Sequence, residues 1–260
     1  MTKRFGLKVG LIFFLMLLLA IPLAMIQDVV SERSDYREQA KRSIAHSWTG
    51  SQKLLGPVLV VPYSERYRKK VWDENLEKYR TENRTRREAL YLLPKILEID
   101  GSVVSEERKR GLYAIPVYSA SLDIRGSFDN AGVMELEKDA SRRIEWEAAY
   151  VALRVSDLRG VVTQPVLEWN GTKAPFASGA RMGNGRGMHA PVGVLKASTA
   201  ASYAFDLSVE LHGMERLQFA PVGGSTRVSL HSDWPHPSFI GRYLPARRDI
   251  SASDFSAQWK

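Results

Sequence analysis

An uncharged apolar run of 18 residues, from Val9 to Ile26, constrains this chain more than any other feature of its sequence. At about 1.5 Å per residue, a helix of this length rises roughly 27 Å, which is close to the thickness of the hydrocarbon core of a bilayer. The run therefore predicts one membrane-spanning helix. No later stretch of the sequence is long and apolar enough to span again.

The residues around this run indicate an uncleaved anchor rather than a signal peptide. Lys3, Arg4 and Lys8 precede it, which fits either kind of segment. Cleavage after Ala24 would place Pro22 at the −3 position, where a small residue is needed. We therefore expect the anchor to be retained, with its basic N-terminus in the cytoplasm and everything after residue 27 on the other side of the membrane.

A helical stalk is expected to follow the anchor. Tyr36, Ala40 and Ile44 recur every four residues among charged side chains, as on one face of a helix. The sequence thus divides into three predicted parts: a cytoplasmic tip and anchor over residues 1–27, a stalk over 28–50, and an exported domain over 51–260.

Composition removes several classes of function. The chain has no cysteine, which excludes thiol nucleophiles, thiol redox chemistry and cysteine-based metal sites. Its net charge of +8 would favour nucleic acid in a cytosolic protein, but an exported domain does not meet nucleic acid, so no such partner is expected.

Much of the positive charge lies in one stretch, Arg66 to Arg87, which holds nine Lys or Arg against four acidic residues. One interpretation is a solvated hairpin loop whose charges keep a sheet edge soluble. The alternative is a surface for anionic lipid or an acidic partner, since basic residues near a membrane can each contribute about 1 kcal/mol.

After the stalk, the apolar period changes from that of a helix to that of a strand. The even positions of Leu112–Phe128 are mostly apolar, and polar residues alternate with them from Ser119. Tyr203–Leu211 repeats this alternation, and Asn170-Gly171 is typical of a two-residue hairpin turn. The pattern predicts a mainly β, antiparallel sandwich-like domain. Further strands are predicted at Val58–Tyr63, Ala89–Leu93, Leu97–Val104, Ile144–Val155, Val161–Trp169, Leu217–Ala220, Thr226–Ser232 and Phe255–Trp259.

Two segments carry residue types suited to chemistry. The glycine-rich stretch from Gly179 to His189 includes Arg181 and Arg186, which suit an anion, but it lacks the strand, helix and lysine of a phosphate-binding loop and is interpreted as a surface loop. The histidines do not have metal-ligand spacing, so no metal or other cofactor is expected.

The second segment, His231–Ser238, combines two histidines, a carboxylate and serines, the residue types of a hydrolase triad. No nucleophile-elbow motif accompanies them. Its two prolines indicate a rigid, extended turn instead, with Trp234 expected to be largely buried against the domain.

This second segment also carries a family resemblance. The sequence from Ser232 to Gly241, SDWPHPSFIG, followed by YLPARR over 243–248, resembles the signature of the CreD family of bacterial inner-membrane proteins, also called cell envelope integrity proteins. Other segments fall in the order of that family. They are SERSDYR from Ser31, Gly56-Pro57, EER from Glu106, SDLRG from Ser156, and the glycine-rich stretch ending at His189.

The resemblance implies an N-terminal anchor, a periplasmic domain and several further membrane helices, which are expected to be absent from this chain. It implies a role in envelope homeostasis and brings no catalytic residues. We expect a non-enzymatic protein that binds an envelope partner, and the alternative is an envelope hydrolase or carbohydrate-binding module using residues 179–189 and 231–238. Candidate structural or binding residues are Asp233, Trp234, Pro235, His236, Pro237, Ser238, Phe239, Leu244, Pro245 and Arg247, with Arg181, Arg186 and His189 as possible binding residues.

Overall fold

The computed structural model describes residues 2–74, 77–183, 185–193, 195 and 201–260, which form two compact units. The first contains the N-terminal helix α1 (Thr2–Ser47) together with Arg108–Ile115. The second contains Trp48–Glu107 and Pro116–Lys260 and is called the β domain below.

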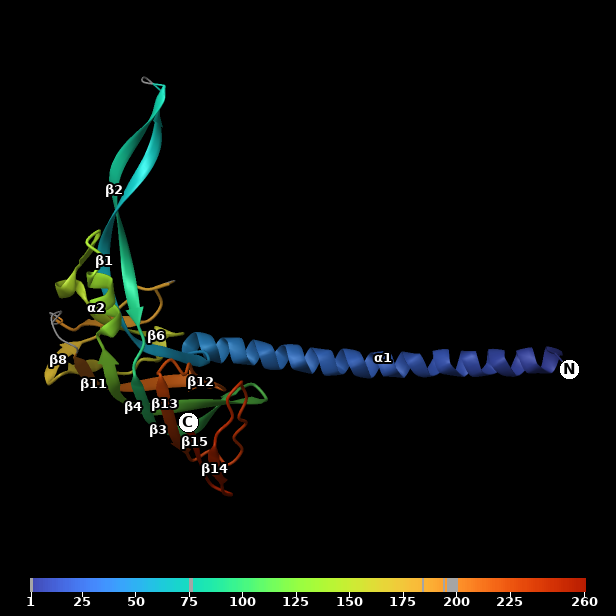
Figure 1. The fold of residues 1–260 in the computed structure, drawn as a ribbon. Coiled ribbons are helices and arrows are strands. Elements are labelled where there is room, and N and C mark those ends of the chain that lie inside the picture. The colour runs from blue at the N-terminus through green and yellow to red at the C-terminus, as the bar shows by residue number, and fades with distance from the viewer. Residues whose placement is uncertain (1, 75–76, 184, 194, 196–200) are drawn as a thin grey trace. The chain divides into compact units, whose positions relative to one another are not determined.

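Helix α1 is one continuous element of 46 residues (Figure 1). Its part from Leu11 to Ser47 is long and apolar enough to cross a membrane, and none of its most apolar 18-residue window is buried within the protein. The predicted helix over Val9–Ile26 and its continuation through the stalk are both confirmed. Side chains such as Phe13 and Leu23 are more than 60% exposed, as expected for a surface that meets lipid rather than water.

The β domain consists of two sheets, and the first holds seven strands among the described residues. Strand β1 is its centre, because it pairs with β2, β5, β6 and β12 along its length. The pairing with β12 is parallel, which the sequence did not predict. The strands are β1 (Gln52–Asp73), β2 (Lys78–Leu92), β5 (Arg142–Ile144), β6 (Tyr150–Val155), β9 (Ala177–Ser178), β10 (Met188–Pro191) and β12 (Leu217–Phe219).

The second sheet has eight strands among the described residues, in the order β14-β15-β13-β3-β4-β11-β7-β8. The pairing of β13 with β3 is parallel, while β4 and β11 pair antiparallel from Asp129 to Val117. The strands are β3 (Ile96–Arg110), β4 (Tyr113–Asp129), β7 (Val166–Trp169), β8 (Thr172–Pro175), β11 (Ser202–Met214), β13 (Ser225–Ser232), β14 (Arg247–Ile250) and β15 (Phe255–Trp259).

The two sheets share one hydrophobic core. Leu59 and Val151 of the first sheet belong to the same buried cluster as Leu122 and Leu207 of the second. The alternating burial of β11, whose odd positions from Tyr203 are buried, shows why period-two patterning identified this strand. The mainly β, sandwich-like prediction is therefore confirmed, with mixed rather than purely antiparallel sheets.

In the part of the chain that the structure describes, three short helical elements interrupt the strands, α2 (Ala131–Glu137), η1 (Trp146–Ala148) and η2 (Leu158–Gly160). The predicted strand over Ile144–Val155 is divided by η1, and β7 begins only at Val166 rather than at Val161. The predicted turn at Asn170-Gly171 is confirmed, since both residues have positive φ and they join β7 to β8.

The basic stretch from Arg66 to Arg87, called the basic arm below, is not a loop. Strands β1 and β2 pair through it in unbroken register from Leu59 opposite Leu92 to Asp73 opposite Lys78. Figure 1 draws it as a twisted two-stranded ribbon that reaches out from the rest of the β domain. Most of its side chains are exposed, as predicted, and Asn75 and Leu76 lie outside the described residues.

Candidate functional site

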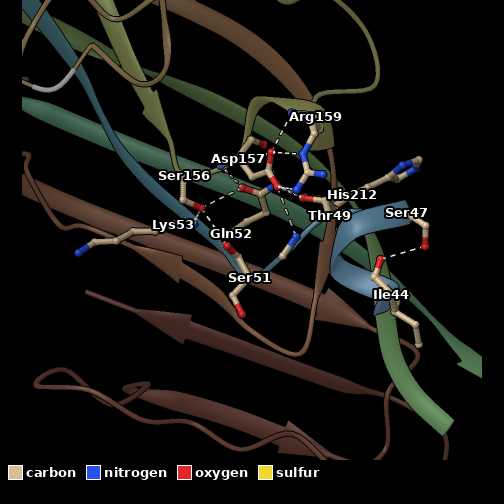
Figure 2. A network of polar contacts seen from close by, with 11 residues as sticks. Ile44, Ser47, Thr49, Ser51, Gln52, Lys53, Ser156, Asp157, Arg159 and His212 are labelled. Atoms are coloured by element: carbon tan, nitrogen blue, oxygen red, sulfur yellow. Dashed lines mark hydrogen bonds and ion pairs between the residues drawn. The ribbon is translucent and has the colours of Figure 1, made fainter. Parts of the chain in front are cut away.

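A buried glutamine joins three segments of the β domain (Figure 2). Gln52, at the start of β1, is fully buried, and its Nε2 lies 3.0 Å from the Asp157 carbonyl oxygen and 2.9 Å from the His212 carbonyl oxygen. Its Oε1 accepts hydrogen bonds from Ser156 Oγ at 3.1 Å and from the Asp157 backbone N–H at 3.3 Å. A buried amide is stable only when its donors and acceptor are satisfied, which these contacts accomplish.

Asp157 extends this network to the domain surface. Its two carboxylate oxygens accept from Arg159 Nε at 3.0 Å and Nη2 at 2.6 Å, and Thr49 Oγ1 donates to it at 3.1 Å. These bonds, the Arg159 pair foremost, lower the pKa of Asp157 to about 2 because they favour the charged carboxylate. Thr49, Gln52, Ser156, Asp157, Arg159 and His212 are called the junction network below.

Position 160 requires glycine because Gln52 and the His212 backbone approach its Cα closely. A Cβ at this position would lie 2.2 Å from Gln52 Nε2 and 2.4 Å from the His212 carbonyl oxygen. Trp48 adds a stacked contact with the His212 ring, at 4.2 Å between centroids. The Ser156-Asp-Leu-Arg-Gly160 sequence is thus explained by packing and hydrogen bonding, which makes it a structural motif. Sequence reasoning identified the motif but missed Gln52, because its neighbours Ser51 and Lys53 are polar and give no sign that its side chain is buried.

A shallow pocket of about 370 Å³ lies beside the junction network. Arg159 and Arg186 both line it, so one predicted binding residue does meet a surface depression. The Arg159 guanidinium is engaged with Asp157, which offsets its charge toward an incoming anion. The full lining is Val155, Ser156, Asp157, Leu158, Arg159 and Arg186.

The glycine-rich stretch folds back on itself as a hairpin-like turn between β9 and β10, with Asn184 outside the described residues. Gly179 N–H donates to the Gly187 carbonyl at 2.8 Å, and a Cβ on Gly187 would meet the Leu153 carbonyl at 2.4 Å. His189 is 7% exposed, and its Nδ1 is 2.5 Å from the Gly179 carbonyl. The Tyr150 hydroxyl donates to the Arg181 carbonyl at 2.9 Å. These contacts hold the stretch in shape and leave His189 little access to a ligand.

Residues 232–248, called the signature segment below, are fixed at their start by short hydrogen bonds. Asp233 Oδ1 accepts from both the backbone N–H and the hydroxyl of Ser105, each at 2.8 Å, and the Trp234 Nε1 donates to the His236 carbonyl at 2.8 Å. The Phe239 ring packs edge-on against Phe255 and Trp259, with 5.6 Å between centroids in each pair.

Trp234 is half-buried, so it packs against the domain as expected without joining the fully buried core. Asp233 joins the turn to Ser105 of β3, and the Phe239 ring packs the next part of the segment on β15. His236 and Ser238 are exposed, while Pro235 and Pro237 are half-buried. From Ile240 onward the segment is mostly exposed.

The predicted candidates therefore do not form one centre. His189 belongs to the first sheet and contacts Gly179 and Tyr150, whereas Asp233 contacts Ser105 of the second sheet. The polar contacts of these residues share no partner. Across the described ranges, no three His, Asp or Glu side chains gather closely enough to hold a metal ion.

Comparison with known proteins identifies a family and a relative. The sequence profile of the family described as inner membrane protein CreD matches residues 4–260. The inner membrane protein CreD of Escherichia coli (strain K12) is 33% identical over 256 residues, which cover 97% of this chain and 54% of that protein. The chain thus spans about half the length of this relative. No solved structure matches this chain significantly.

Proposed function

The chain belongs to the family of the inner membrane protein CreD, and from this premise we propose that it is a non-enzymatic envelope protein whose periplasmic β domain binds a protein partner. The apolar window of α1 supports the anchor, since it is uncharged and unburied. The preceding Lys3, Arg4 and Lys8 support a cytoplasmic N-terminus, which leaves the β domain in the periplasm.

One observation carries the binding role. Ile240, Tyr243 and Leu244 are each more than 60% exposed, although they lie within five consecutive residues of the signature segment. Clustered exposed apolar side chains are more typical of protein interaction sites than of ordinary surface. The Phe239 contacts with Phe255 and Trp259 hold the start of this stretch against β15, so less conformational entropy is lost when a partner binds.

The hydrolase or carbohydrate-binding alternative has less support. Catalysis by a histidine and a carboxylate needs both within hydrogen-bond reach of one reacting group. His189 and Asp233 have separate contacts in different sheets, and the His236 side chain is exposed on a turn. Neither the pocket lined by residues 155–159 and 186 nor the one lined by residues 247–249 and 256–258 joins the two predicted segments.

Complementation in cells that lack the endogenous gene distinguishes these two roles. We expect Tyr243→Asp combined with Leu244→Asp to abolish protection against envelope stress, measured as detergent sensitivity, while protein level and membrane insertion remain unchanged. His236→Ala should protect as well as the parent chain. The double variant Val162→Asp and Val166→Asp, at other exposed apolar positions, is the matched control. Loss of protection with His236→Ala, together with full protection by the signature-segment variant, would contradict the binding role.

A further inference from the structure

The turn between β3 and β4 lies in the same compact unit as the membrane helix. Residues 108–113, called the hairpin tip below, contact α1 at two positions. The Tyr113 hydroxyl donates to the Arg33 carbonyl at 3.1 Å, and Arg110 Nε donates to Ser43 Oγ at 3.1 Å. Both contacts lie on α1 after Ile26, the last residue of the uncharged run. The hairpin tip is therefore on the side of the membrane where α1 emerges after Ile26.

The height of this contact above the bilayer follows from the helix. Arg33 comes seven residues after Ile26, the last residue of the uncharged run, which corresponds to about 10 Å along the helix axis. The polar headgroup layer is roughly 5–8 Å thick on each side of the hydrocarbon core. The Tyr113 hydroxyl thus lies within a few ångströms of the headgroups, and any tilt of the helix shortens that distance.

The chemistry of the hairpin tip matches an anionic surface. Arg108, Lys109 and Arg110 are consecutive and exposed, and Leu112 is 100% exposed at the turn itself. Gly111 has φ +59°, which allows the tight turn that presents Leu112 outward. The gap from the Tyr113 hydroxyl to the headgroups is shorter than the distance of about 8 Å over which charges act at physiological ionic strength. Arg110 bonds Ser43 farther along the helix, about 25 Å past Ile26, so the Leu112 and Tyr113 side of the tip is the side nearer the bilayer, and Arg108 and Lys109 approach it with their long side chains.

We propose that the hairpin tip is a second membrane contact, in which Arg108, Lys109 and Leu112 engage the headgroup layer of anionic phospholipids beside α1. This inference rests on the proposed membrane-spanning role of α1. It assigns the tip a function that is separate from the signature segment and from the basic arm. The anchored helix and the hairpin tip then make two contacts with one bilayer, which restricts rotation of the unit about the helix axis.

The absence of native cysteine allows a direct test with single-cysteine variants of the full chain. Leu112→Cys is labelled with a fluorophore, and quenching by nitroxide-headgroup lipid is measured in phosphatidylcholine vesicles with and without phosphatidylglycerol. Leu93→Cys, at an exposed leucine of the β domain, is the matched control. Gln27→Cys, at the end of the uncharged run, reports whether α1 is inserted.

We expect quenching at position 112 to exceed that at position 93 and to rise when phosphatidylglycerol is present. It should fall when salt is raised to about 1 M, where the screening length is about 3 Å. Arg108→Gln and Lys109→Gln should each lower the equilibrium ratio of membrane-bound to unbound hairpin tips about fivefold. Equal quenching with and without phosphatidylglycerol, or none above position 93, would overturn the inference when position 27 is quenched. An unquenched position 27 would instead overturn the proposed anchor, and with it this inference.

Discussion

Two hairpins among the described residues both carry positive charge, but different contacts hold them in place. The basic arm consists of β1 and β2 beyond the core, where an unbroken backbone ladder and the ion pair of Arg86 with Glu65 connect the two strands. The hairpin tip ends two strands whose bodies are in the core, and it bonds to α1 through Tyr113 and Arg110. The comparison shows that positive charge alone does not define a function. The attachment of each hairpin decides what its charges can reach.

The largest expected effect is on the free energy of unfolding, and it distinguishes the start of the β1–β2 pairing in the core from the outer part of the basic arm. Leu59, where the β1–β2 pairing begins, is fully buried, whereas Tyr67 in the outer arm is 38% exposed. Leu59→Ala should lower the free energy of unfolding by about 2–5 kcal/mol because it removes core contacts and leaves a cavity. Tyr67→Ala should change it by less than about 1 kcal/mol. Chemical unfolding of the detergent-solubilised chain, followed by tryptophan fluorescence, measures both; equal losses would mean that the arm is packed along its whole length.

A second prediction concerns the other end of β1, where the junction network lies. The pKa of Asp157 is about 2 in the folded chain and 3.8 for an ordinary aspartate, so its stabilising contribution is complete above pH 3.8 and disappears as the pH falls to about 2. After allowance for solvent screening we expect this contribution to be roughly 1–2 kcal/mol. Asp157→Asn should lower stability at pH 7 by about that amount and flatten the acid limb of the stability curve. An unchanged acid limb would show that the carboxylate is not held by these bonds.

Charge reversal within the basic arm gives a third, smaller effect. Arg86 lies 2.6 Å from Glu65, which also bonds Arg142 at 3.3 Å, and these arginines lower the pKa of Glu65. Arg86→Glu should therefore destabilise the folded chain more than Lys69→Glu or Arg87→Glu, since it places two carboxylates together. Lys69→Glu and Arg87→Glu should each stay within about 0.5 kcal/mol. Similar costs for all three substitutions would mean that the Glu65 contacts contribute nothing.

The smallest expected effect concerns the contact of the hairpin tip with α1. Tyr113→Phe removes the hydroxyl that donates to the Arg33 carbonyl and keeps the aromatic ring. We expect a loss of about 0.5–1.5 kcal/mol in the attachment of the tip to α1, which is typical of one neutral hydrogen bond. Faster rotational depolarisation of a fluorophore at Leu112→Cys would report this loosening. Arg68→Gln, on the basic arm, is the control that should leave the depolarisation unchanged.

The sequence predicted those parts of the fold that depend on local periodicity. The uncharged run, the alternation in Tyr203–Leu211 and the turn at Asn170-Gly171 each encode their structure within a few residues. The basic arm escaped prediction because backbone pairing forms its ladder without any apolar alternation. The parallel pairings of β1 with β12 and of β13 with β3 join segments far apart in the chain, so no local pattern reveals them.

The candidate site was less predictable for a similar reason. The Ser156–Gly160 motif stood out as a sequence, but its partners Thr49, Gln52 and His212 come from distant segments. The contact of Asp233 with Ser105 could not be predicted either, since the two residues lie 128 positions apart in the chain.

The central claim, that α1 spans the inner membrane with the β domain outside the cytoplasm, has a direct test in the cysteine-free background. Thr2→Cys and Leu112→Cys are expressed separately, and spheroplasts are treated with a membrane-impermeant maleimide. Both positions belong to the unit that contains α1, and Leu112 is fully exposed. We expect the Leu112→Cys variant to be labelled in intact spheroplasts and the Thr2→Cys variant to be labelled only after lysis. Labelling of the Thr2→Cys variant but not of the Leu112→Cys variant in intact spheroplasts would contradict it.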